Sequence, residues 1–217
     1  MSDVILPRTM SNMIAEALRD QILSGEIPTG TRLQQNDIAA RFRVSSTPVR
    51  EAFAELRRQG LVSGHEHRGV RVARPTLHDV INTSDVLELL EKPCIVASVP
   101  HLTDEDLAKA RDLMSAHRSV PANEWRRRLD LDTAFHTALL VRCPNTKLKE
   151  LSAECHRESA AHKLMTSALE GEDLMETVYA QHEAIMEACE ARNARQAGAR
   201  TVDHIRWGRE AVRMGLK

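Results

Sequence analysis

Apolar residues recur at helical spacing near the start of the chain. Ile14, Leu18 and Ile22 are four residues apart and form one stripe, which predicts a helix over residues 9–24. Gly25 suits the end of that helix, because glycine readily adopts the left-handed conformation found there. A turn and a short strand at residues 31–33 are expected next, followed by a second helix over residues 34–42.

A third helix is predicted to begin near Ser45 and to end at Gly60. Serine and threonine residues around position 46 can cap its start, and Pro48 is tolerated only in the first turn. One face of this helix is apolar, whereas Arg50 and Arg57 lie on the other. The arginine-bearing face is therefore free to meet a partner.

Two short alternating segments, residues 61–62 and 70–72, predict a hairpin with its tip over residues 63–69. Short helices, a capped helix and a basic hairpin in this order are typical of a winged helix-turn-helix, which places its third helix in the major groove of DNA. The alternative is a small helical domain with a solvated arginine face.

The distribution of charge favours DNA binding. The whole chain has a formal net charge of -1, yet residues 1–75 contain 11 arginines, no lysine and only eight acidic residues. Arginine suits bidentate contacts to phosphate and guanine. The basic excess in the first part of the chain therefore indicates double-stranded DNA as its partner.

The rest of the chain shows helical spacing and no strand-like alternation. Pro75 marks the linker, so we expect a DNA-binding domain over residues 1–75 and an all-helical domain over residues 76–217. The aromatic content is 3%, which predicts a core of aliphatic side chains. The expected fold class is mainly α, with helices near residues 77–98, 104–118, 122–142, 145–168, 173–191 and 194–214.

The cysteine spacing and the lack of long apolar runs indicate where in the cell the protein is expected. The four cysteines are far apart and form no CxxC pair, which is typical of reduced structural thiols. No run of about 18 apolar residues occurs. We therefore expect a cytoplasmic protein with no membrane span.

Four residues in the second domain suggest a metal site. Asp132 and His136 are four residues apart and share a helix face, while His182 and His204 fall in two later helices. Such a set can close around one divalent ion in a bundle core. Spacing alone leaves open the alternative that each is an ordinary core or surface residue.

Residues 25–33, 44–52 and 60–62 resemble the GntR family of bacterial transcription regulators. In that family the third helix usually begins Ser-Arg-x-Pro-Val-Arg, and this chain has Ser46 at the first arginine and Arg50 at the second. The resemblance implies DNA contacts from these residues: Asn36, Ser46, Thr47, Arg50, His65, Arg68 and Gly69.

Residues 132–136 match the Asp-x-x-Phe-His signature of the FCD domain, the effector domain of FadR-type GntR regulators. The six-helix count is similar to that of the shorter, VanR-like subgroup. The resemblance implies a divalent metal ion held by Asp132, His136, His182 and His204. Zinc and nickel both suit imidazole ligands, and the ligand set does not choose between them.

Open coordination positions on such an ion could bind a small carboxylate or hydroxy acid. The family's usual arginine four residues before Glu91 is replaced by Leu87, so the effector pocket is expected to differ from that of common acid-binding relatives. Candidate polar pocket residues are Arg142, Arg157 and His162, with solvated or salt-bridged positions as the alternative. Histidines that match no motif are expected at the surface: His78, His101, His117 and His156.

The sequence therefore predicts a ligand-responsive transcriptional regulator, most simply a repressor. A homodimer would present two third helices to a near-palindromic operator. Two alternatives remain open, a metal-dependent hydrolase-like enzyme and a regulator that senses the metal ion itself. No nucleophile–histidine arrangement or phosphate-binding loop is apparent, so an enzyme is not expected.

Overall fold

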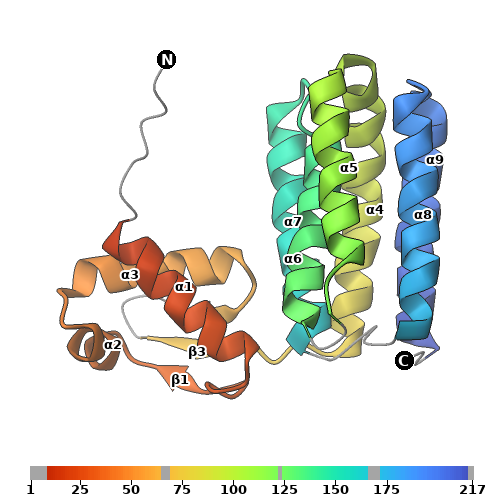
Figure 1. Cartoon of the computed structure of the whole chain (residues 1–217). Coiled ribbons are helices and arrows are strands. Elements are labelled where there is room, and N and C mark those ends of the chain that lie inside the picture. The colour runs from red at the N-terminus through yellow and green to blue at the C-terminus, as the bar shows by residue number, and fades with distance from the viewer. Residues whose placement is uncertain (1–8, 65–68, 122–123, 166–171, 215–217) are drawn as a thin grey trace, which may run out of the picture. The chain divides into compact units, whose positions relative to one another are not determined.

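The computed structural model describes residues 9–64, 69–121, 124–165 and 172–214 (Figure 1). The chain divides into two compact units, residues 1–74 and residues 75–217. Helices dominate the described backbone, and strands occur only in the first unit. The predicted mainly α fold class is thereby confirmed.

The first unit contains three helices close to the predicted positions: α1 (Met10–Leu23), α2 (Gln35–Phe42) and α3 (Ser46–Arg58). Thr9 caps α1, since its side chain accepts a hydrogen bond from the backbone of Asn12. The predicted apolar stripe of α1 is buried and packs against α3.

A small antiparallel sheet completes the first unit, with β1 (Arg32–Leu33), β2 (Val62–Gly64) and β3 (Val70–Val72) in the order β1-β3-β2. Strands β2 and β3 form the predicted hairpin. Gly69 directly precedes β3 with φ of +82°, and a Cβ there would lie 2.6 Å from the carbonyl oxygen of Leu33. The close approach of β1 therefore requires glycine at this position.

The second unit is a bundle whose helices lie side by side with their long axes roughly aligned (Figure 1). Helix α4 packs against α7 and α9, and α5 packs against α6 and α8. The helices are α4 (Leu77–Ser98), α5 (Asp104–Arg118), α6 (Trp125–Leu139), α7 (Thr146–Met165), α8 (Glu172–Glu190) and α9 (Ala194–Arg213), with a 3-10 turn, η2, at Val99–His101.

Local signals explain where these helices begin. Thr76 and Asp79 form a capping box at the start of α4, in which each side chain bonds the backbone of the other. Thr103 and Asp106 do the same for α5. Helix α4 continues through Pro93 to Ser98, so the proline does not end it.

The core of the bundle is largely aliphatic, as the composition predicts. Fully buried side chains from α4, α6 and α8 meet in it, among them Ile95, Leu139, Ile185 and Met186. All four cysteines are buried and free. Among the described helices, none is both long and apolar enough to cross a membrane.

Candidate functional site

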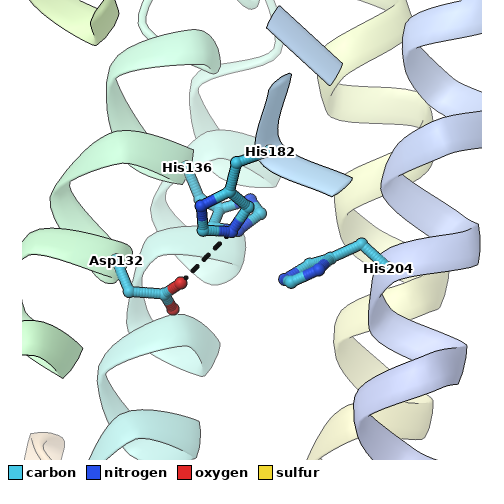
Figure 2. A group of neighbouring side chains, drawn as sticks. All are labelled: Asp132, His136, His182 and His204. Carbon is cyan, nitrogen blue, oxygen red and sulfur yellow. Dashed lines mark ion pairs between the residues drawn. The ribbon is translucent and has the colours of Figure 1, made fainter. Parts of the chain in front are cut away.

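Four side chains from three helices of the second unit meet inside the bundle. Asp132 and His136 come from α6, His182 from α8 and His204 from α9. Each offers one ligand atom, and these atoms all lie within 4.8 Å of one another. Figure 2 shows the four side chains pointing toward one another. The structure thus brings together the set that the sequence predicts.

His182 lies at the centre of this cluster. Its side chain is fully buried, and its Nδ1 makes no hydrogen bond to any described residue. Its Nε2 pairs with Oδ1 of Asp132 at 3.3 Å. Burial lowers the pKa of His182 to about 4, so the ring is neutral at neutral pH. A buried neutral imidazole beside a carboxylate is suited to a metal ion.

The other two imidazoles are oriented by neighbours. Nδ1 of His136 lies 2.8 Å from Oε1 of Glu91, and Nδ1 of His204 lies 2.8 Å from Oε1 of Gln181. An acceptor beside Nδ1 selects the tautomer in which Nε2 carries the lone pair. Metal-binding histidines generally have such a partner on the nitrogen that does not bind the ion. The donor set and its orientation therefore fit zinc or nickel.

Glu91 contacts a second imidazole, that of His156. Nε2 of His156 lies 2.8 Å from Oε2 of Glu91, and the His156 ring stacks on that of His136 with centroids 4.8 Å apart. Burial would raise the pKa of Glu91, but the charges and hydrogen bonds of His156 and His136 outweigh it and hold the pKa below its usual range. Glu91 is therefore a buried carboxylate that fixes the orientation of His136.

Replacing Glu91 with glutamine is expected to weaken metal binding by about 10- to 100-fold, because loss of an outer carboxylate loosens the ligand it orients. Isothermal titration with nickel measures the change. Glu88→Gln is the matched control, since Glu88 is on the same helix but pairs with Arg206 and Arg209. Equal nickel affinities for both variants and the natural chain would show that Glu91 does not position a ligand.

The metal-stripped protein is expected to lose stability between pH 7 and pH 5. Burial lowers the pKa of both His182 and His117, so the unfolded chain binds more protons in this range and stability rises with pH. For His182 alone the loss at pH 5 is about 2 kcal/mol. Both tryptophans, Trp125 and Trp207, belong to the second unit, so their fluorescence during urea unfolding reports on it. Equal unfolding free energies at the two pH values would contradict this assignment.

A cavity of about 70 Å³ adjoins the cluster and touches Asp132, His136 and His204. Trp125 and Trp207 also line it, although neither was assigned to a site from the sequence. The remaining lining includes side chains from α4, α5, α7 and α8, so each of the helices α4 to α9 contributes to the cavity wall.

Two histidines expected at the surface are instead buried and line this cavity, His117 at 2% exposure and His156 at 5%. That prediction was wrong because neither lies in a recognised motif, and their burial depends on how α5 and α7 pack. Arg128 is a further lining residue that the sequence did not single out. It is buried, donates hydrogen bonds to the carbonyl oxygen of Val120 and lies over the ring of Trp125.

The three candidate effector residues are not among the described residues that line the cavity. Arg142 is 47% exposed and pairs with Asp106 at 2.7 Å. Arg157 is exposed on α7. His162 is buried, but its Nδ1 faces the hydroxyl of Thr83 at 3.3 Å. The solvated or salt-bridged alternative describes Arg142 and Arg157, and an effector role for the three residues stays a prediction.

The outer face of α3 carries the residues expected to contact DNA. Ser46 and Thr47 are exposed in its first turn, and Nη2 of Arg50 lies 3.4 Å from the hydroxyl of Thr47. The opposite face is buried against α1. The side chain of Gln35 donates to the carbonyl oxygen of Ser46 at 2.9 Å, which ties α2 to the start of α3. The helix-turn-helix thus presents the first turn of α3 outward.

The other residues expected to contact DNA are Asn36, His65, Arg68 and Gly69. Asn36 is exposed at the start of α2, and Gly69 has the backbone role described above. His65 and Arg68 lie outside the described residues. Arg57 links α3 to the hairpin, because its guanidinium donates to the carbonyl oxygen of Gly64 at 3.1 Å.

Comparison with known proteins agrees with the division of the chain into a first and a second unit. Residues 10–72 match the family model described as "Bacterial regulatory proteins, gntR family", and residues 82–206 match the FCD domain. The uncharacterized HTH-type transcriptional regulator YdhC of Bacillus subtilis is 24% identical over 190 residues, covering 87% of this chain and 84% of the relative.

Two further similarities are narrower or structural. The HTH-type transcriptional repressor RspR of Escherichia coli is 29% identical over 133 residues, covering 60% of this chain and 58% of the relative. The structure of E. coli McbR/YncC shares the fold, with a TM-score of 0.75 at 18% identity over 97% of this chain and all of that one. The FCD match alone spans more than half of the chain. This chain therefore belongs to the GntR family of bacterial regulatory proteins and, within it, to the members with an FCD domain.

Proposed function

We propose that this transcriptional regulator is a repressor whose FCD domain binds a divalent metal ion, zinc or nickel, together with a small carboxylate effector. The observation that carries the metal assignment is the convergence of four ligand atoms, from Asp132, His136, His182 and His204, within 4.8 Å of one another in the interior of the bundle. Polar groups gathered in the interior are costly unless they are paired, and a divalent ion would bind these imidazoles and the carboxylate together.

The DNA-binding half of the proposal rests on α3. Its exposed first turn presents two hydroxyls, and the Arg50 guanidinium follows in the second turn, which suits contacts to base edges and phosphates. We propose a homodimer on a near-palindromic operator, because a two-fold axis places two such helices about one DNA turn apart. Such a regulator acts where the DNA is, in the bacterial cytoplasm.

The effector half rests on coordination chemistry. Three imidazoles and one carboxylate leave room on a divalent ion for an oxygen of a small acid. The cavity beside the cluster gives that acid a place to lie. Helix α4 is the element through which binding reaches the DNA-binding unit, since it carries Glu91 beside the cluster and begins at Leu77, shortly after β3 ends at Val72. An effector that favours one arrangement of α4 would shift the population of DNA-binding dimers.

Fluorescence anisotropy on an operator selected from random DNA by the protein itself tests the proposal. We expect DNA affinity that falls steeply with salt, a complex with two chains per operator, and release of DNA when a carboxylate binds the nickel-loaded protein. Affinity that follows the metal alone would indicate a metal sensor instead. Hydrolysis of a carboxylic ester by the loaded protein would indicate an enzyme.

A further inference from the structure

Two arginines of the chain have a backbone conformation that arginine rarely adopts. Among the described residues other than glycine, only Arg43 and Arg192 have a positive φ, and in both it is 55°. In this left-handed region the Cβ of an ordinary residue lies too close to the following carbonyl oxygen, so glycine or asparagine usually occupies it. At these two positions the chain therefore keeps an arginine against a cost in backbone strain.

The turn between α2 and α3 (Figure 1) contains the first of these arginines, Arg43. The left-handed conformation of this residue lets the backbone N–H of Val44 donate to the carbonyl oxygen of Ala39 at 3.0 Å. That hydrogen bond closes the end of α2 and sets the direction in which the chain continues into α3. Glycine could make the same turn without strain, so the turn alone does not explain an arginine side chain.

The second arginine, Arg192, shows what such a side chain does when it serves the fold. Its guanidinium donates to the carbonyl oxygen of Leu102 and to Oδ1 of Asp104, which ties the end of α8 to the start of α5. Arg43 has no comparable role. Its side chain is exposed and makes no hydrogen bond or ion pair with any residue that the structure describes. The guanidinium of Arg43 is therefore available to a partner outside the chain.

The position of Arg43 next to α3 indicates what that partner is. Between Asp37 and Glu51 the sequence contains three arginines and no acidic residue, so this surface attracts anions. The Cα atoms of Arg43 and Ser46 are at most about 11 Å apart, because only three residues separate them along the chain. In a helix-turn-helix the recognition helix enters the major groove, while the helix before it crosses the DNA backbone. A side chain at the end of α2 is therefore expected to face phosphates that flank the bases contacted by α3.

We propose that Arg43 binds a backbone phosphate beside the bases that α3 contacts, and that this contact fixes the position of α3 in the major groove. Arginine suits this task, because its guanidinium can donate two parallel hydrogen bonds to one phosphate group. The proposal rests on the proposed entry of α3 into the groove, and it adds a residue to those expected to contact DNA.

Replacing Arg43 with glycine removes the guanidinium and keeps the turn. One phosphate contact contributes about 0.9 to the slope of log affinity against log salt, so its loss should lower affinity about 8-fold at about 0.1 M salt for each chain bound. Fluorescence anisotropy of the full-length protein between about 50 mM and 200 mM salt measures the affinity and the slope. The loss should be the same on a selected operator and on an unrelated duplex, because phosphates carry no sequence information. An affinity and a slope equal to those of the natural chain would overturn the proposal.

Arg41→Ala is the matched control, because Arg41 is exposed at the end of the same helix and its guanidinium lies over the ring of Phe42, 5.6 Å from the centroid. This variant loses the same charge as Arg43→Gly, yet its affinity for DNA should fall less. Arg43→Lys should keep most of the affinity, because an ammonium group also binds phosphate. Equal losses for Arg41→Ala and Arg43→Gly, or a loss by Arg43→Gly that is confined to the operator, contradict a phosphate contact by Arg43.

Thermal unfolding followed by circular dichroism separates this role from a role in folding. The midpoint for Arg43→Gly should equal or exceed that of the natural chain, because relief of the strained position offsets the greater flexibility of glycine in the unfolded chain. A lower midpoint would show that the side chain serves the fold, against the proposal. Weaker DNA binding by Arg50→Ala but not by Arg43→Gly removes the Arg43 contact while the assignment of α3 stands. Unchanged binding by Arg50→Ala removes the entry of α3 into the groove and, with it, this inference.

Discussion

Replacement of His182 with alanine is expected to reduce affinity for nickel or zinc by about a hundredfold or more. His182 is the fully buried member of the cluster, and the other ligand atoms lie within 4.8 Å of its own. Loss of an outer-shell partner already costs 10- to 100-fold in metal affinity, and loss of a ligand should cost at least as much. Isothermal titration on chelator-treated protein provides the measurement.

His101→Ala is the matched control for this experiment, because His101 is an exposed histidine of the same unit in η2. Its affinity for nickel should equal that of the natural chain. Circular dichroism checks that both variants keep their helices. Full metal occupancy of a folded His182→Ala protein would show that the ion is held by residues other than this cluster.

Replacement of Arg50 with alanine is expected to weaken operator binding by about 10- to 100-fold, the range for loss of one good bidentate contact to a base. Arg50 lies in the second turn of α3, and its guanidinium contacts the Thr47 hydroxyl on the same helix. The first turns of a recognition helix meet the base edges. Anisotropy with selected operator DNA at fixed salt measures the loss.

Arg58→Ala provides the charge-matched control on the same helix. Arg58 is 68% exposed at the other end of α3 and pairs with Glu55. Its removal lowers the net charge equally but leaves the first turns intact, so the effect on affinity should be smaller. Equal losses for the two variants would mean that α3 contributes only general electrostatic attraction, without a specific contact by Arg50.

Much of the fold could be predicted from local sequence signals. The apolar spacing of α1 matches its buried stripe, and α3 begins at Ser46, next to the predicted start, although the side chain of Ser45 makes no capping hydrogen bond. The backbone role of Gly69 became apparent only from the structure. The shared helix face of Asp132 and His136 follows from their four-residue separation. That His182 and His204 join them came from the family resemblance, because spacing between different helices does not fix distance.

The residues that were missed or misplaced depend on contacts between helices. His156 resembles any polar residue on a helix until α7 packs against α4 and brings it to Glu91. Arg128 is buried through a backbone carbonyl and an aromatic ring that no sequence pattern links to it. Arg142 looked suited to an acid pocket, yet Asp106 at the start of α5 pairs with it at the surface. Sequence periodicity assigns a residue to a face, but only packing decides what that face meets.

X-ray absorption spectroscopy of the nickel- or zinc-loaded, full-length protein tests whether Asp132, His136, His182 and His204 together hold the ion. We expect one ion per chain, with the scattering of three imidazoles and with nitrogen and oxygen ligands at about 2.0–2.2 Å. Loss of one imidazole in His182→Ala would assign that ligand. A stoichiometric ion without imidazole scattering, or no stoichiometric ion at all, would contradict a metal centre built from these three histidines.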